Sequence, residues 1–217
     1  MQKKAILFDI DGTLVDSNDL HVTAWDEVLR EAGHNFDRAT LHSQIGKGGD
    51  NYVPALLPEA DEEEQERLKK AHGEVFKRYI HDIRPFPGAR ELLLKVRDSG
   101  RKVVLASSAS GEELEKHVEN LGAADILDGS TSKDDVGHSK PCPDIFQAAL
   151  EQAGVSAEEA VVVGDTPYDI EAARRSGIDA VAVRSGGFPD ETLHDAVAIY
   201  DDVGGLLADF DRSPLSR

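Results

Sequence analysis

Short apolar runs with little polar alternation recur along this chain. We predict buried strands at residues 3–9, 102–108, 160–165 and 179–184, and a weaker strand at 196–200. Continuous apolar runs of this length, rather than alternating ones, are typical of strands that are covered on both faces. The pattern therefore indicates a sheet built from parallel strands.

Segments with apolar positions at helical spacing separate the later strands. They span residues 111–122, 143–154 and 167–177, and each one ends on a glycine that can cap a helix. Alternation of strands and helices is the rhythm of a doubly wound, Rossmann-like α/β core with a parallel sheet. In such a core, ligands bind outside the carboxyl ends of the strands.

The alternation is interrupted once, after the first strand. Residues 17–84 have helical character and contain no convincing strand. We interpret this stretch as an inserted α-helical cap. The Rossmann-like catalytic core would then comprise residues 1–16 and 85–217.

Composition narrows the class of protein. Of the 217 residues, 40% are hydrophobic and 30% are charged, and one cysteine, Cys142, excludes an intramolecular disulfide. No run approaches the roughly 18 apolar residues of a transmembrane helix. The net charge of −18, from 24 basic and 42 acidic residues, should repel nucleic acid. We expect a cytoplasmic protein with no nucleic-acid or membrane partner; monomer and homodimer both stay open.

Polar side chains capable of catalysis collect where the predicted strands end. Each has an ordinary explanation, as a turn former, a helix cap or a surface lysine. Together they mark one edge of the sheet as a site: Asp9, Asp11, Gly12 and Thr13 after the first strand, Ser107 and Ser108 after the second, Lys140 before a helix, and Asp165 and Asp169 after the third.

This set of residues suits phosphoryl transfer. One carboxylate can attack phosphorus and form an aspartyl-phosphate, and a second one can move the proton. Mg²⁺ prefers hard oxygen ligands such as aspartates. A lysine, a serine hydroxyl and the turn N–H groups near Gly12 and Thr13 can hold phosphate oxygens.

The motifs FDIDGTLVDS, the strand end at Ser107, Lys140 and GDTPYD, in this order, resemble the four motifs of the haloacid dehalogenase (HAD) superfamily. The helical insertion is similar to the C1 cap of its subfamily I. The resemblance implies that Asp9 is the nucleophile and Asp11 the general acid and base. It implies phosphate binding by Ser107 and Lys140. It also implies Mg²⁺ held by four residues: Asp9, the backbone carbonyl of Asp11, Asp165 and Asp169.

The subgroup is indicated by finer features. Asp11 favours phosphoryl transfer, because the dehalogenases that name the superfamily lack this aspartate. GDTPYD resembles phosphoglycolate-phosphatase-like hydrolases, whereas DSNDLHVTAW, with His21, resembles β-phosphoglucomutases. The loop at 44–57 lacks the arginine with which a mutase holds a second phosphate, and its only cation is Lys47.

We therefore expect a Mg²⁺-dependent phosphatase of a small phosphomonoester, either phosphoglycolate-like or sugar-phosphate-like. A β-phosphoglucomutase-like phosphomutase is the alternative, and a non-catalytic regulatory protein is a more distant one. Two residues of the insertion are candidates for substrate selection, His21 and Lys47. The alternatives for them are a solvent-facing histidine at a helix start and a mobile surface loop.

Overall fold

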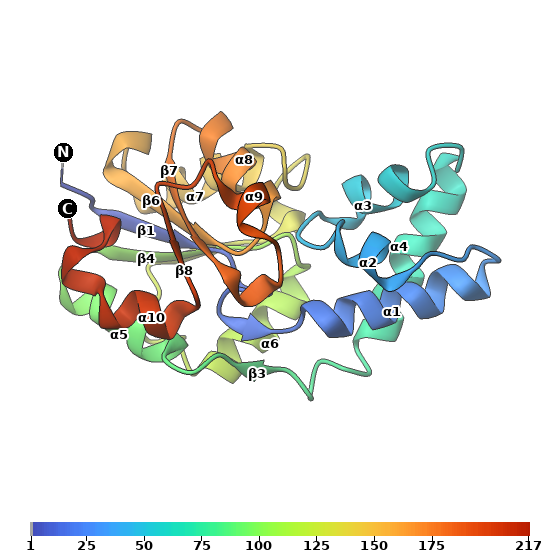
Figure 1. The fold of residues 1–217 in the computed structure, drawn as a ribbon, viewed down its shortest axis with the longest axis horizontal. Coiled ribbons are helices and arrows are strands. Elements are labelled where there is room, and N and C mark those ends of the chain that lie inside the picture. The colour runs from blue at the N-terminus through green and yellow to red at the C-terminus, as the bar shows by residue number, and fades with distance from the viewer. Residues whose placement is uncertain (1) are drawn as a thin grey trace.

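The computed structural model describes residues 2–217, and its centre is a six-stranded parallel sheet (Figure 1). The strand order is β5-β4-β1-β6-β7-β8. The strands are β1 (Ala5–Phe8), β4 (Lys102–Ala106), β5 (Gly129–Thr131), β6 (Ala160–Gly164), β7 (Asp179–Val183) and β8 (Ala198–Tyr200). Phe8 pairs with Leu105 on one side and with Val163 on the other. The chain therefore leaves β1, β4 and β6 at the same edge of the sheet.

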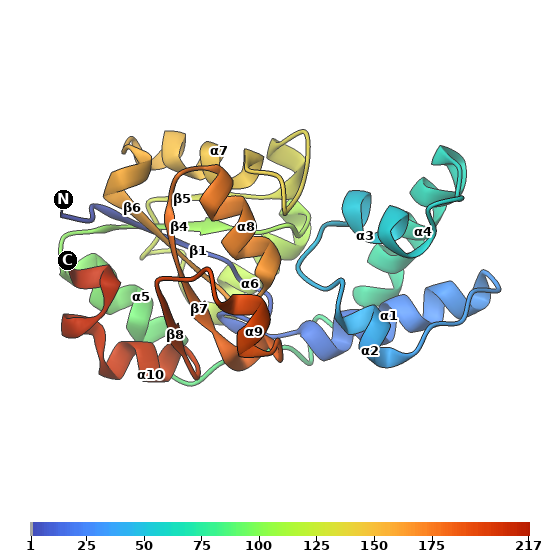
Figure 2. The ribbon, with the colours of Figure 1, turned by 45° about the horizontal axis from the view of Figure 1, so that its top comes forward.

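Helices cover both faces of this sheet. One face packs α5 (Ala89–Asp98), α6 (Gly111–Leu121) and α10 (Val203–Ala208) against Ile6 and Phe8. The opposite face packs α7 (Asp144–Ala153), α8 (Pro167–Arg175) and α9 (Asp190–Leu193) around Leu7. Figure 2 shows α5 and α10 on one side of the strands and α7 and α8 on the other. The predicted α/β fold with a parallel, doubly wound sheet is confirmed.

The remaining four helices pack together, and along the chain they fall between two short strands. They are α1 (Asn18–Glu31), α2 (Arg38–His42), α3 (Gly49–Leu56) and α4 (Glu62–Phe76). Val15–Asp16 (β2) and Arg84–Pro85 (β3) pair antiparallel where the chain leaves and rejoins the sheet region. The helices share a small apolar core that includes Trp25, Tyr52 and Leu68. Figure 1 shows them beyond the sheet, at the end away from the two termini.

Short 3-10 turns connect several elements: Lys133–Asp135, Ala157–Glu159, Arg184–Gly186, Phe210–Arg212 and Pro214–Ser216. The turn at 184–186 follows β7 and contacts the first motif, because the Ser185 hydroxyl donates a hydrogen bond of 2.7 Å to the carbonyl of Gly12. None of the helices within residues 2–217 is both long and apolar enough to cross a membrane.

Candidate active site

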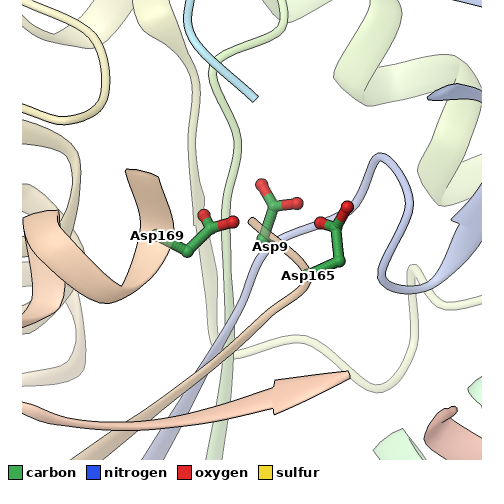
Figure 3. Close-up of side chains that lie close together, drawn as sticks. All are labelled: Asp9, Asp165 and Asp169. Atoms are coloured by element: carbon green, nitrogen blue, oxygen red, sulfur yellow. The ribbon is translucent and has the colours of Figure 1, made fainter. Parts of the chain in front are cut away.

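Three buried aspartates meet at the edge of the sheet where β1 and β6 end. Asp9 follows β1, Asp165 follows β6, and Asp169 lies in the first turn of α8. Their exposed fractions are 5%, 0% and 1%. One carboxylate oxygen from each lies within 4.8 Å of the others. Figure 3 shows the three side chains next to one another, with Asp9 in the middle.

A single buried lysine partly neutralises this cluster. The ammonium of Lys140 contacts an oxygen of Asp9 and lies 2.7 Å from Oδ1 of Asp169. Burial opposes its charge, but these two carboxylates raise the pKa of Lys140 above its usual range. Burial also raises the pKa of Asp9 to about 7, because the repulsion of Asp169 and Asp11 counters the attraction of Lys140. The cluster therefore lacks positive charge.

Asp165 is held rigidly by hydrogen bonds to both of its oxygens. The Thr13 hydroxyl donates to Oδ1 over 2.9 Å, and Nδ2 of Asn18 donates to Oδ2 over 2.9 Å. Burial, followed by the charges of Asp9 and Asp169, raises the pKa of this carboxyl well above its ordinary value. Gly12 has φ +75°, and a Cβ there would lie 2.2 Å from Asp165. The glycine thus permits the close approach of the first loop.

This donor set fits a divalent cation. Three carboxylate oxygens from two strand ends and a helix start converge in a buried space with one lysine to balance them. Buried charges without sufficient compensation are costly, and hard oxygen ligands are those that Mg²⁺ and Ca²⁺ take. Asp169 keeps Oδ1 turned to Lys140 because its Oδ2 accepts from the hydroxyl and N–H of Thr166. The arrangement supports a divalent metal site.

Asp11 has surroundings quite different from those of Asp9. Three polar groups lie close to its Oδ1: the Ser17 hydroxyl, which donates over 2.6 Å, Nε2 of His21 at 3.3 Å and Nε2 of His117 at 3.4 Å. Burial disfavours the charge, but the two histidines, His117 foremost, hold the pKa of Asp11 well below its usual range. Burial likewise opposes protonation of His117, and Asp11 nevertheless raises the pKa of that ring.

The residues predicted to bind phosphate lie around the same edge. Thr13 is fully buried and its hydroxyl is engaged by Asp165. The Ser107 hydroxyl is also buried and accepts a hydrogen bond of 3.0 Å from the N–H of Ala109. Ser108 lines a cavity next to Asp9, and its buried hydroxyl has no hydrogen-bonding partner within residues 2–217. The Ser108 hydroxyl is therefore free for a ligand, and the Ser107 hydroxyl, which here only accepts, still has its O–H to donate.

The cavity lies between the sheet edge and helices α1, α3 and α4, with a volume of about 560 Å³. Asp9, Asp11 and His21 line it, and so do five lysines: Lys47, Lys69, Lys70, Lys77 and Lys133. More acidic residues than lysines line the same cavity, and two of the lysines form ion pairs with them: Lys69 with Glu66, and Lys77 with Glu74 and Glu112. The lysines therefore do not make the cavity positively charged overall. His21 stacks on Phe76 with ring centroids 3.7 Å apart, so its ring is held in place beside Asp11.

Lys47 lies at the cavity wall but its ammonium has partners on the protein. It donates to Gln44 over 2.6 Å and lies 4.6 Å from the centre of the Tyr168 ring. Burial lowers the pKa of this lysine. The structure thus brings Lys47 to the cavity without placing it against the aspartates.

Contacts join the helical insertion to the loop that carries Lys140. Nδ2 of Asn51, in α3, donates to the carbonyls of Ser139 at 2.9 Å and Lys140 at 3.3 Å. On the other side, Nε2 of His42 lies 2.9 Å from the carbonyl of Gly186. The helical insertion therefore contacts the core from two directions beside the site.

Several residues that support the site could not be assigned a role from the sequence motifs. Asn18 was predicted only as part of the insertion, yet it holds Asp165. His117 belongs to none of the sequence motifs, yet it contacts Asp11 from α6. Gly186 follows a different strand, and a Cβ at this position would lie 1.8 Å from Oδ2 of Asp165. Gly186 lies in the turn after β7 and belongs to none of the motifs.

We expect Gly186→Ala to disable metal binding while the protein still folds. The added methyl must push Asp165 away from Thr13 and Asn18, since it would otherwise overlap the carboxylate. Titration with Mg²⁺, followed by calorimetry, should show a loss of affinity of about 10-fold or more, as for other changes to groups that orient metal ligands. The matched control is Gly111→Ala, whose Cβ would come no closer than 3.5 Å to its nearest neighbour. Unchanged affinity in Gly186→Ala would contradict the placement of Asp165.

Comparison with known proteins identifies the family. Residues 6–183 match the family of haloacid dehalogenase-like hydrolases. The chain is 28% identical to the fructose-1-phosphate phosphatase YqaB of Escherichia coli, over 82% of this chain and 95% of that one. It is 31% identical to a phosphoglycolate phosphatase of Aquifex aeolicus, over 80% and 81% of the two chains. A crystal structure of a hydrolase from Pseudomonas syringae superposes with a TM-score of 0.91 at 32% identity, covering 97% of this chain and 99% of that one.

These matches confirm two predictions made from the motifs. The resemblance to the HAD superfamily holds for most of the chain, and the enzyme class, a phosphoric monoester hydrolase, agrees with the relatives. The site geometry and the matches support the same conclusion: this chain belongs to the haloacid dehalogenase-like hydrolase family.

Proposed function

We propose that this protein is a Mg²⁺-dependent phosphatase that hydrolyses a small phosphomonoester through an aspartyl-phosphate at Asp9. One observation carries the proposal. Asp9 is buried beside two further aspartates and a lysine, and it lines the cavity. A carboxylate with a cationic neighbour and access to a ligand is suited to attack phosphorus.

In the first half of the proposed reaction, an oxygen of Asp9 bonds to phosphorus and the bond from phosphorus to the ester oxygen breaks. For this step Asp11 must be protonated, which its two histidine neighbours oppose in the free site; the negative charge of a bound phosphoryl group favours the protonated form. Asp11 then gives this proton to the departing oxygen, so that the product leaves as an alcohol. In the second half, water bonds to phosphorus, Asp11 takes the proton from that water, and the bond to Asp9 breaks. The products are the alcohol and inorganic phosphate, and the site returns to its starting state.

Other residues of the chain prepare these steps. Asp9, Asp165 and Asp169, with the backbone carbonyl of Asp11, would hold Mg²⁺, which offsets the charge of the phosphoryl oxygens when bound. Lys140 sits between Asp9 and Asp169 and would hold a phosphoryl oxygen. Ser108 has an unused hydroxyl at the cavity wall. Ser107 would donate its O–H to a phosphoryl oxygen, and Gly12 and Thr13 would present N–H groups from the surrounding loop.

The cavity supports a small substrate. Its volume of about 560 Å³ is in the range of sites for small metabolites. The relatives named for fructose 1-phosphate and phosphoglycolate act on phosphorylated compounds of this size class. We propose that the substrate is a phosphoglycolate-like or sugar-phosphate-like ester that binds near His21 and Lys47. We also propose that the enzyme acts in the cytoplasm.

We also propose that residues 17–84 act as a cap that moves against a core of residues 1–16 and 85–217. The β2–β3 pair is the place where both connections run side by side, so bending at 15–18 and 83–87 would open the cavity. Such gating admits substrate and then excludes bulk water. The contacts of Asn51 and His42 across the gap would break on opening.

A substrate panel in Mg²⁺ tests the proposed function. It comprises phosphoglycolate, fructose 1-phosphate, glucose 6-phosphate, β-glucose 1-phosphate and a nucleoside monophosphate, with free phosphate and sugar-phosphate isomers both measured. We expect phosphate release from at least one ester, ranked by kcat/KM. Interconversion of isomers stimulated by glucose 1,6-bisphosphate, without net phosphate release, would replace the phosphatase with a phosphomutase. The absence of arginine from 44–57 and the engagement of Lys47 by Tyr168 favour the hydrolase.

A further inference from the structure

We propose that His117 is a positioning residue that fixes Asp11 for proton transfer to the leaving group. This inference rests on the proposed function, in which Asp11 protonates the departing oxygen. His117 lies on α6, far along the chain from the first motif, and its side chain is only 1% exposed. Its Nε2 lies 3.4 Å from Oδ1 of Asp11.

The ring has no competing partner. No hydrogen bond reaches either of its nitrogens within residues 2–217, and the approach to Asp11 is its one close polar contact in that range. A buried histidine without partners is costly, because its polar atoms lose their hydration. If position 117 served packing alone, a leucine there would avoid the free-energy cost of burying two polar ring nitrogens. The contact with Asp11 is therefore the feature that accounts for a histidine at this place.

The three polar groups around Asp11 lie against the same oxygen. Ser17, His21 and His117 all approach Oδ1, and none of these contacts involves Oδ2. Asp11 lines the cavity, so holding one oxygen in place determines where the other one can meet a substrate. His117 thereby acts on the reaction through Asp11 and needs no contact with the substrate.

The two histidines differ in their attachment. His21 belongs to α1 of the helical insertion, whereas His117 belongs to α6, which packs against the sheet. Motion of the insertion would carry His21 away from Asp11 but would leave His117 in place. We infer that His117 keeps Asp11 oriented throughout turnover, and that His21 adds its contact when the cavity is closed.

The test compares leaving groups. 4-Nitrophenyl phosphate releases a stable anion that needs no proton, whereas an alkyl ester such as a sugar phosphate needs one. We expect His117→Leu to lower kcat/KM for the alkyl ester by about 10-fold to 100-fold, and for 4-nitrophenyl phosphate by less than about 3-fold. His117→Gln, which keeps a donor, should recover part of the loss. Chemical denaturation of both variants establishes that they fold.

A second measurement separates positioning from a general structural effect. In an Asp11→Asn background, His117→Leu should cause little further loss on the alkyl ester, since residues that act through one another are not additive. Equal losses on both esters, or full additivity with Asp11→Asn, would overturn the assignment of His117. Failure of the unaltered protein to hydrolyse either ester would instead count against the proposed function.

Discussion

Asp9→Asn should abolish turnover and leave the fold intact. The amide has nearly the shape of the carboxylate but cannot serve as the nucleophile, so we expect kcat to fall by roughly 10⁴-fold to 10⁶-fold, the scale found when a nucleophile is removed. Removing one negative charge from a cluster of three buried carboxylates should not destabilise the protein. The measurement is phosphate release in Mg²⁺ alongside a urea denaturation curve.

The matched control for this variant is Asp98→Asn. Asp98 ends α5 on the protein surface, where its side chain is 67% exposed and lies beside Arg97. The change is chemically identical and should leave kcat unaltered. Metal-dependent hydrolysis at a normal rate in Asp9→Asn would show that another group attacks phosphorus.

Asp165→Asn should weaken metal binding at the site and, with it, catalysis. We expect a loss of activity of about 10³-fold, equivalent to several kcal/mol of transition-state stabilisation by the metal. The unaltered protein should gain stability with Mg²⁺, by about 2.7 kcal/mol when the metal is at 100 times its dissociation constant. In the variant this gain should largely vanish, because one of the three carboxylates is gone.

The metal-free variant should be at least as stable as the metal-free parent. Asp165 is buried with two other carboxylates and one lysine, so its negative charge destabilises the folded state until a cation binds. Thermal melts with EDTA and with Mg²⁺ measure both quantities. A variant that melts earlier in EDTA, yet keeps the full gain from Mg²⁺, would show that Asp165 is a structural residue and not a ligand.

The parallel sheet and its active edge could be predicted because a strand buried on both faces must be a continuous run of apolar residues. The apolar runs that become β1, β4, β6 and β7 are covered on both faces, and polar residues directly after them mark the edge. The observed strands are one to three residues shorter than the apolar runs, because the terminal residues turn out of the sheet. Asp9 and Asp165 are examples, since they directly follow Phe8 and Gly164, the last paired residues of β1 and β6.

Elements with little apolar content escaped prediction. The strand β5 is formed by Gly129–Thr131, whose Gly-Ser-Thr sequence is typical of a turn, and only its pairing with β4 makes it a strand. The β2–β3 pair consists of two residues on each side. Near the end of the stretch at 17–84, which is predicted to be helical, α4 ends at Phe76 and turns follow. Tertiary contacts decide each of these cases, and local preference does not.

The supporting residues of the site escaped prediction for a related reason. His117 and Asp11 are more than one hundred residues apart in the sequence, and no residue spacing within α6 predicts their contact. Asn18 begins α1, where a polar residue is ordinary at a helix start, yet its amide holds Asp165. Motifs identify the residues that perform chemistry, whereas the residues that orient them are visible only once the chain is folded.

The central claim is that Asp9 carries the phosphoryl group during turnover. Rapid acid quench of the enzyme with a hydrolysed ester, followed by mass spectrometry of its peptides, tests this claim most directly. We predict the added mass of one phosphoryl group on the peptide that contains Asp9, present within the first turnover and lost after substrate is exhausted. Its appearance on any other residue, or a complete first turnover with no modified peptide at any quench time, would contradict the account.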